Sequence, residues 1–195
     1  MKESNLTSLL NQQQDCIKKI QKNSDLIDQI IQILINGRNS GKRIFTMGNG
    51  GSGSTASHFV ADLLKTVITK DDKRFSAISL VDNIPVSLAW SNDVSYEEIF
   101  VEQLKNHFSK GDIIIAFTGS GNSKNVIKAL KYGKKNGAIC IGITGMTGGQ
   151  LPIICDVCFL VPSSNMLTIE SMHLLICHCI IEVIRKSGKP MFSYD

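Results

Sequence analysis

The amino-acid sequence predicts an α/β fold, a three-layer α/β/α sandwich with a five-stranded parallel sheet, preceded by an N-terminal pair of helices. From Lys42 onward, short apolar runs of strand length alternate with longer segments of helical periodicity. The runs are nearly continuous in apolar residues, which is typical of strands buried on both faces of a parallel sheet. Repeated β-α units place helices on both faces of such a sheet. The 195 residues, 43% of them hydrophobic, suffice for the core of one domain.

The first forty residues predict two helices. The first has an apolar stripe at helical spacing, made of Leu6, Leu9, Leu10, Ile17 and Ile20. Ser24 is the expected N-cap of the second. The second helix has a broad apolar face over 27–35, which indicates contact on more than one side and hence a partner subunit. We expect residues 1–41 to serve oligomerisation and residues 42–195 to form the α/β core.

The remaining elements follow in alternation. The expected strands are 43–47, 75–80, 112–117, 138–143 and 157–161. The expected helices are 54–65, 85–91, 96–108, 123–136 and 166–186. In folds of this kind, ligands bind beyond the carboxyl ends of the strands.

Charge and hydropathy limit the partners and the compartment. The net charge of +4 comes from 21 basic and 17 acidic residues dispersed along the chain, which does not predict a nucleic-acid partner but suits an anionic metabolite. The longest apolar stretch, 166–184, contains four ionisable residues, so we expect a buried helix and no membrane span. Polar residues follow Met1, so we expect no signal peptide and a cytoplasmic protein.

The six cysteines do not predict a disulfide framework or a zinc finger. Cys155 and Cys158 form a single Cys-x-x-Cys within 152–161, which resembles a strand. Residues three apart in a strand point to opposite faces, a poor geometry for shared chelation. The other four cysteines lie in apolar surroundings and are expected to be buried as small hydrophobic residues.

Two glycine- and hydroxyl-rich loops give the strongest indication of function. The loops 48–55 and 118–123 each follow an expected strand and precede a helix. Backbone N–H groups and hydroxyls at a helix N-terminus favour an anion, so two such loops predict a pocket for a phosphorylated small molecule. For the second loop the alternative is a simple helix cap at Ser123, but its three hydroxyls exceed what a cap needs.

The first loop also matches the dinucleotide-binding pattern Gly-x-Gly-x-x-Gly at Gly48, Gly50 and Gly53. That pattern needs an acidic residue at the end of the second strand, about 20 positions on. Asp82 ends the strand but comes 29 residues after Gly53. A nicotinamide cofactor is therefore not expected.

Two helices each offer a histidine and a carboxylate at helical spacing. His58 and Asp62 are four apart on one helix, and Glu170 and His178 are eight apart on the last one. His173 lies on nearly the same side as Glu170. Such groups converge on a divalent metal or an acid/base pair, and the alternative is hydrogen-bonded core histidines. The fourth histidine, at the end of the expected helix 96–108, is expected to be solvated.

Several motifs in the same order resemble the sugar isomerase (SIS) domain, and specifically the phosphoheptose isomerases. These are Gly48-Asn49-Gly50-Gly51-Ser52 with His58-Phe59, Asn92-Asp93-x-x-Tyr96-Glu97-x-x-Phe100, Ser120-Gly121-Asn122-Ser123-x-Asn125-Val126, and Gly145-x-x-Gly148-Gly149. The resemblance covers residues 42–186. It implies a homotetramer with active sites near subunit boundaries. It also implies interconversion of sedoheptulose 7-phosphate and D-glycero-D-manno-heptose 7-phosphate through an enediolate, which supplies heptose for cell-surface polysaccharides.

The resemblance also implies roles for individual residues. The phosphate is assigned to Ser52, Thr118, Ser120 and Ser123, and the sugar to Asn49 and Asp93, with Gly50, Gly51 and Gly119 completing the substrate-binding loops. The metal-binding positions are His58, Asp62, Glu170 and His178, and proton transfer falls to Asp62, His178 and Glu170. This donor set suits one zinc, or another divalent metal, in each active site.

The chain departs from the family pattern at three positions. The family usually has Glu where Asp62 stands, Gln where Glu170 stands and Thr where Gly119 stands. Misplacing a catalytic base by about 1 Å can lower a rate on the order of 100-fold, whereas Glu170 adds a carboxylate that can bind metal or take up protons. Two alternatives therefore stay open: a non-catalytic SIS tetramer that binds a phosphosugar as a regulator, and an isomerase of another phosphosugar.

Overall fold

The computed structural model describes residues 5–194. The polar start of the chain at Met1, from which the absence of a signal peptide is predicted, lies outside the described residues. One sheet of five parallel strands has the order β2-β1-β3-β4-β5. The strands are β1 (Arg43–Met47), β2 (Ser76–Ser79), β3 (Ile113–Thr118), β4 (Ile139–Thr144) and β5 (Val157–Leu160). The five expected strands and the parallel sheet are confirmed, and no strand end is shifted by more than one residue.

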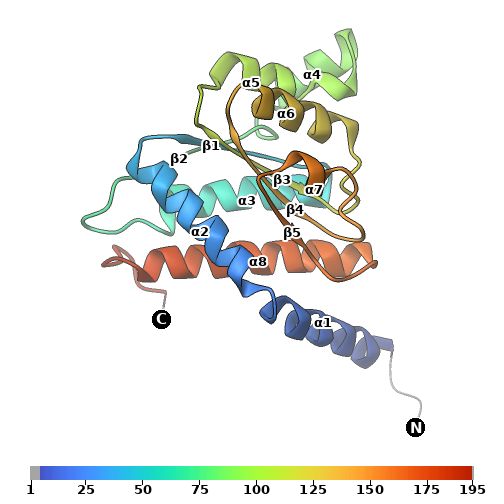
Figure 1. Cartoon of the computed structure of the whole chain (residues 1–195), viewed down its shortest axis with the longest axis vertical. Helices are drawn as coiled ribbons and strands as arrows, with labels where there is room; N and C mark the ends of the chain where they lie inside the picture. Colours follow the sequence, from blue (N-terminus) through green and yellow to red (C-terminus); the bar gives the residue numbers. More distant parts are fainter. Residues whose placement is uncertain (1–4, 195) are drawn as a thin grey trace.

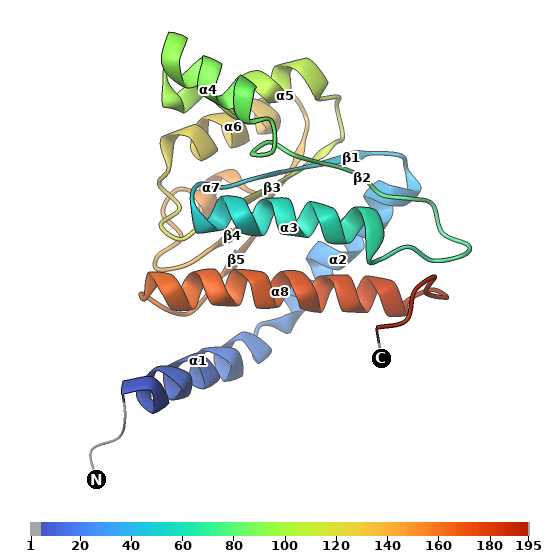
Figure 2. The same cartoon turned by 180° about the vertical axis from the view of Figure 1, so that it is seen from behind.

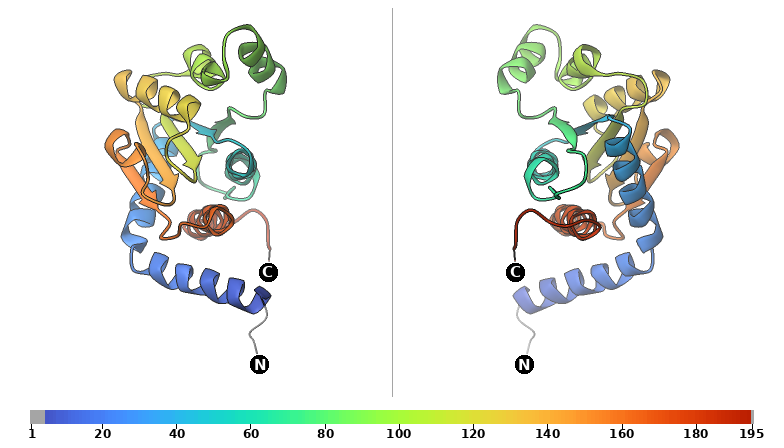
Figure 3. Two further views of the ribbon diagram at one scale, coloured as in Figure 1. Left: turned by 90° about the vertical axis from the view of Figure 1, so that its right-hand side faces the viewer. Right: turned by 90° about the vertical axis from the view of Figure 1, so that its left-hand side faces the viewer.

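Helices cover both faces of this sheet, which confirms the three-layer architecture (Figures 1 and 3). One layer contains α2 (Ser24–Asn39), α3 (Gly51–Lys65) and α8 (Met166–Lys186). The other contains α4 (Ile84–Asp93), the 3₁₀ helix η1 (Tyr96–Glu98), α5 (Val101–His107), α6 (Lys124–Lys135) and α7 (Leu151–Ile154). Each layer has its own apolar core against the sheet: Leu34, Phe59 and Ile180 lie in the first, and Leu104, Leu130 and Leu151 in the second.

The register of the sheet determines where the loops meet. Met47 at the end of β1 pairs with Ala116 of the neighbouring β3. The carboxyl ends of β1 and β3 therefore lie side by side. As a result, the loop that follows Met47 and the loop that follows Thr118 open at the same edge of the sheet.

The N-terminal helix pair is confirmed, but its first helix stands apart from the body. Helix α1 (Asn5–Gln21) projects away from the sandwich (Figures 1 and 2). Its leucines at positions 6, 9 and 10 are exposed, and burial begins at Cys16 and Ile20 near its end. The prediction that Ser24 caps α2 is wrong: Asn23 occupies the N-cap position without a side-chain cap bond, and Ser24 is the first helical residue.

Two segments differ from the sequence prediction. The helix expected over 96–108 is divided into η1 and α5 because Ile99 and Phe100 turn into the core between them. The strand expected over 152–161 begins only at Val157, because residues Leu151–Ile154 form the short helix α7 instead.

That short helix corrects the expected geometry of the Cys-x-x-Cys pair. Cys155 is the C-cap of α7 and Cys158 lies in β5. Their sulfur atoms lie 3.1 and 3.3 Å from the position that a Cβ atom on Gly142 would take, so both thiols are on the same side of the chain. Burial raises the pKa of the Cys158 thiol to about 11, which keeps it protonated at neutral pH. Cys179, expected to be buried, is exposed.

Helix α8 is long and apolar enough to cross a membrane by length and composition alone, and half of its most apolar window is buried. In the fold it lies alongside α3 (Figure 2). Ile176, Cys177 and Ile180 of α8 belong to the core cluster that it shares with α2, α3 and the sheet. It is therefore a helix that packs against the core with about half of its most apolar window buried, whereas the sequence predicts a buried helix.

A buried carboxylate fastens the start of β3 to β1. Asp112, which is 2% exposed, accepts hydrogen bonds from the backbone N–H groups of Arg43 and Ser109 at 3.0 and 2.8 Å. It also lies 3.2 Å from Nε of Arg43. We expect Asp112→Ala to lower the free energy of unfolding by about 2–3 kcal/mol, because two part-buried N–H donors lose their buried, charged acceptor. Urea denaturation measures this loss.

The matched control is Asp15→Ala, since Asp15 also pairs with a cation, Lys18, but both side chains are more than 60% exposed. We expect this substitution to change stability by less than about 0.5 kcal/mol. Equal effects at the two positions would contradict the role given to Asp112.

Candidate functional site

A cleft of about 690 Å³ opens at the carboxyl edge of the sheet. It lies between the loop after β1, the first two turns of α3 and the segment around η1. The lining residues are Gly48, Asn49, Gly50, Gly53, Ser54, Ser57, His58, Val81, Ser87, Tyr96, Ile99 and Phe100. The predicted first loop and one of the predicted histidines therefore line one cavity.

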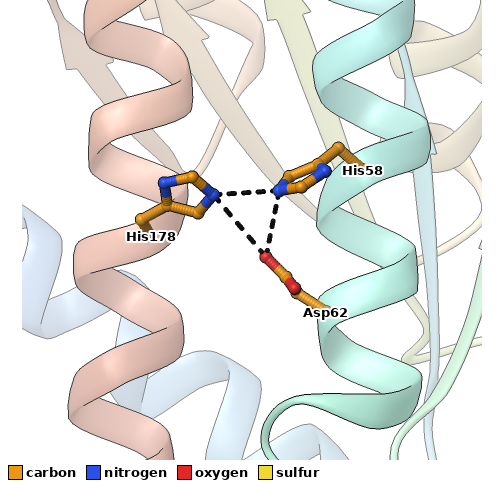
Figure 4. Close-up of side chains that lie close together, drawn as sticks. All are labelled: His58, Asp62 and His178. Carbon is orange, nitrogen blue, oxygen red and sulfur yellow. Dashed lines mark hydrogen bonds and ion pairs between the residues drawn. The ribbon is translucent and has the colours of Figure 1, made fainter. Parts of the chain in front are cut away.

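His58, which lines this cleft, belongs to a cluster in which two imidazoles and a carboxylate converge (Figure 4). Nε2 of His58 lies 2.9 Å from Nε2 of His178. Oδ2 of Asp62 lies 3.3 Å from the first of these nitrogens and 3.9 Å from the second. The histidine side chains are about half exposed and that of Asp62 is 16% exposed. Among the described residues, this set forms a group whose geometry can hold a metal ion.

The cluster arises from the packing of α3 beside α8. His58 and Asp62 share a face of α3 because they are one turn apart. Gly51 of α3 contacts Glu170 of α8, and His58 contacts His178 seven and eight residues later. The two helices therefore run parallel, and corresponding turns stay side by side. Groups separated by 120 positions in sequence meet for this reason.

Glu170 lies two turns before His178, about 12 Å along the helix axis. Its carboxylate atoms are 2.6–2.8 Å from the position that a Cβ on Gly51 would take, so a side chain at position 51 would displace the carboxylate from this place. This places a negative group at the first residue of α3, where the helix dipole stabilises it. Glu170 is not part of the three-residue group within one chain, and its metal-binding and catalytic roles stay predictions.

The first loop is held by two asparagines and a tyrosine. Nδ2 of Asn125 donates to Oδ1 of Asn49 at 2.8 Å, and Nδ2 of Asn49 donates back to Oδ1 of Asn125 at 3.0 Å. The hydroxyl of Tyr96 also donates to Oδ1 of Asn49 at 2.9 Å. Asn125 is 2% exposed. Sequence reasoning gave neither Asn125 nor Tyr96 a role, although both stand in the motifs that carry the family resemblance.

The second loop is a compact turn at the start of α6. Oγ1 of Thr118 accepts a hydrogen bond from the backbone of Gly121, and Oγ of Ser120 accepts one from the backbone of Asn122, both at 3.3 Å. Gly121 has φ +67° and packs against the carbonyl of Gly148, which excludes a side chain there. Ser123 occupies the N-cap position without a side-chain cap bond, so the predicted cap by its hydroxyl is wrong.

Gly119, where the family usually has threonine, lies against α8. The sulfur of Met166 occupies the space that a Cβ at this position would need. The hydroxyl that is missing from the loop is therefore replaced by a thioether at the end of α8. This change makes that side of the loop apolar.

Three other predicted positions lie away from the cluster. Asp93 is the last residue of α4, accepts a hydrogen bond from Asn92 at 2.8 Å, and is not among the residues that line the main cleft. His173 is fully buried beside Phe117, and burial lowers its pKa to about 4, so it is a neutral core histidine. His107 is exposed at the end of α5, as expected.

The donor set fits a divalent metal such as zinc. Zinc prefers imidazole nitrogen and carboxylate oxygen, at about 2.0–2.2 Å, in a tetrahedral arrangement. Donors around such an ion are about 3.3 Å apart. The three observed separations of 2.9, 3.3 and 3.9 Å bracket this value. Three ligands leave one position open, as in catalytic zinc sites.

Comparison with known proteins identifies the class of protein. A family model of the SIS domain matches residues 9–145. A solved structure of a phosphoheptose isomerase from Francisella tularensis has a TM-score of 0.83 and 27% identity, and the match covers 94% of this chain and 100% of that one. Another from Neisseria gonorrhoeae has a TM-score of 0.86 at 24% identity and shows the same fold. The chain has a SIS domain, and its fold is that of these structures.

Sequence relatives narrow the class further. The phosphoheptose isomerase of Aliarcobacter butzleri is 35% identical over 185 residues, which are 94% of this chain and 97% of the relative. The probable phosphoheptose isomerase of Thermoplasma acidophilum is 38% identical over 145 residues, 74% and 79% of the two chains. The chain belongs to the phosphoheptose isomerase family, and it is an isomerase.

The Asn49–Asn125 pair generates a prediction about the first loop. In Asn125→Asp, the group that donates to Oδ1 of Asn49 becomes a carboxylate oxygen, so two acceptors face each other. We expect a loss of about 1–3 kcal/mol in the free energy of unfolding, because a buried acceptor replaces a donor. Chemical denaturation measures it. Asn106→Asp is the control, since Asn106 is exposed, and an equal loss there would refute the pairing argument.

Proposed function

We propose that this protein interconverts D-sedoheptulose 7-phosphate and D-glycero-D-manno-heptose 7-phosphate through an enediolate. The observation that supports this most is the cluster of His58, Asp62 and His178 beside a cleft whose rim is a glycine- and serine-rich loop. The family relationship supports the same reaction, since relatives named phosphoheptose isomerase match nearly the whole chain. A binding module alone would not require two histidines and a carboxylate at one wall of the pocket.

The two strand-to-helix loops are proposed to bind the substrate. Ser52, Thr118, Ser120 and Ser123, with backbone N–H groups of Gly50, Gly51 and Gly119, would hold the phosphate at helix N-termini. Asn49 and Asp93 would contact the sugar hydroxyls. The paired asparagines fix the first loop before substrate arrives, so binding energy from the phosphate is available to orient the sugar.

The reaction moves one proton between carbons and one between oxygens. A base removes a proton from C1 of the ketose, and the resulting enediolate receives a proton at C2. The proton on O1 is lost and O2 gains one, which completes the aldose. Asp62, His178 and Glu170 are proposed to take up and deliver these protons. A divalent metal held by His58, Asp62, His178 and Glu170, zinc being the expected ion, would act as a Lewis acid on the sugar.

The proposed assembly is a cytoplasmic homotetramer of one SIS domain per chain. The exposed leucines of the projecting helix α1, at positions 6, 9 and 10, support residues 1–41 as its oligomerisation segment. Active sites near subunit boundaries would bring Glu170 and Asp93 to the substrate together with residues of another copy. No nucleic acid and no membrane enters this proposal.

The proposed reaction is tested by incubating the protein with sedoheptulose 7-phosphate, with and without added zinc, and analysing the products. We expect turnover that a chelator removes and zinc restores. His178→Gln should abolish turnover and leave the melting temperature within a few degrees, because a half-exposed side chain is exchanged. The matched control His107→Gln alters a remote exposed histidine and should keep full activity.

Undiminished turnover in His178→Gln would refute the role of that imidazole. A wild-type protein that binds zinc and sedoheptulose 7-phosphate without converting it would instead support a non-catalytic regulator. Conversion of a different phosphosugar alone would support the second alternative.

The phosphate assignment gives a separate prediction. Because the hydroxyl of Ser123 makes no side-chain cap bond, Ser123→Ala should leave stability nearly unchanged. It should raise KM for sedoheptulose 7-phosphate on the order of 10-fold, the value of a hydrogen bond to a charged group, with kcat changed less than about twofold. Ser76→Ala, at the exposed opposite end of the sheet, is the control. Equal KM values would remove Ser123 from the phosphate site.

A further inference from the structure

The two oxygens of Asp62 have different partners. Oδ2 faces the imidazoles of His58 and His178. Oδ1 accepts a hydrogen bond from Oγ1 of Thr66 at 2.9 Å. Thr66 is the C-cap of α3, one turn after Asp62, and neither sequence pattern nor family motif singles it out. The threonine therefore holds the oxygen that the imidazoles do not use.

The hydroxyl is well placed to fix the carboxylate. Thr66 has helical backbone angles, and its N–H donates to the carbonyl of Asp62 at 2.8 Å. The same residue thus contacts Asp62 through both backbone and side chain. A carboxylate held at one oxygen cannot rotate freely about its terminal bond, so its other oxygen stays directed at the histidines.

The bond from Thr66 also keeps the charge of Asp62 available for a cation. The neighbouring Lys65 is directed elsewhere: its ammonium contacts the hydroxyl of Tyr194 and lies 4.6 Å from the ring centroids of Phe192 and Tyr194. Asp62 is therefore held by a neutral hydroxyl, and Lys65 pairs with Tyr194, whose hydroxyl also interacts with the side chain of Thr66. A metal ligand benefits from this arrangement, because outer partners that orient a carboxylate preserve its negative charge.

The short side chain at position 62 makes this contact possible. An aspartate carboxylate stays close to the helix backbone, within reach of the side chain one turn later. A glutamate at position 62 would carry its carboxylate one methylene further from the helix backbone, so its oxygens would not occupy the positions that Thr66 and the imidazoles contact here. Asp62 and Thr66 thus act together: the hydroxyl of Thr66 fixes the orientation of the carboxylate that Asp62 presents to the histidines.

We propose that Thr66 is a positioning residue that orients Asp62 as a metal ligand and thereby sets the metal affinity of the site. This inference rests on the metal-dependent part of the proposed function. It concerns binding of zinc alone, so it is tested without substrate and independently of isomerase activity.

The test is competition of the purified full-length protein with a chromophoric zinc chelator. We expect Thr66→Val, which keeps the shape and removes the hydroxyl, to weaken zinc binding by about 10-fold or more, as loss of an outer-shell partner does. Thr66→Ser keeps a hydroxyl and should restore the affinity to within about twofold to threefold of wild type. Ser187→Ala is the matched control, since this hydroxyl caps the end of α8 but bonds only to the carbonyl of Ile184.

A double-mutant cycle separates orientation from general damage. In the background Asp62→Ala there is no carboxylate for Thr66 to hold, so adding Thr66→Val should change zinc affinity less than about twofold. Thermal melts of the metal-free variants show whether each is folded. Zinc affinity unchanged in Thr66→Val, or lowered equally in both backgrounds, would overturn the proposal.

Failure of zinc binding and failure of the isomerase reaction have different consequences for this proposal. If the wild-type protein binds no zinc, the metal part of the proposed function fails and this inference fails with it. If zinc binds as expected but sedoheptulose 7-phosphate is not converted, the proposed reaction fails while the positioning of Asp62 by Thr66 stands.

Discussion

The parallel packing of α3 against α8 is the constraint on which the site depends. Gly51 admits the carboxylate of Glu170 at one end of the contact, and His58 meets His178 two turns further along. A side chain at Gly51 would displace the carboxylate of Glu170 from this contact. Both helices are anchored in the same apolar layer by Phe59 and Ile180, so burial of the core fixes the distance between the polar groups.

The sheet supplies the other half of the site. Parallel strands bring the loops after β1 and β3 to one edge, and the reciprocal bonds between Asn49 and Asn125 lock these loops together. The cleft thus lies between a rigid glycine-rich rim and the polar wall of α3. Because the asparagine pair holds this rim from within the fold, a phosphorylated sugar would meet donors that are already oriented.

The departures from the family pattern have a common structural setting. Met166 fills the space beside Gly119, Glu170 lies against Gly51, and Asp62 is held by Thr66. The departing residues lie on α3, on α8 and in the loop after β3. The three departures are therefore grouped around the contact between α3 and α8. None of these contacts separates the imidazoles of His58 and His178.

The sequence by itself determined the fold class, the alternation of strands and helices along the chain, and the apolar face of each helix. It could do so because the period of the apolar residues reports burial directly. It also indicated that His58 and Asp62 share a face, since they are one turn apart. Tertiary structure alone decided that His178 joins them within one chain and that Glu170 does not. Tertiary structure also decided that His173 is buried in the core and that the thiols of Cys155 and Cys158 lie on the same side of the chain. These outcomes depend on the register between helices and on the start of α7, which local patterns do not encode.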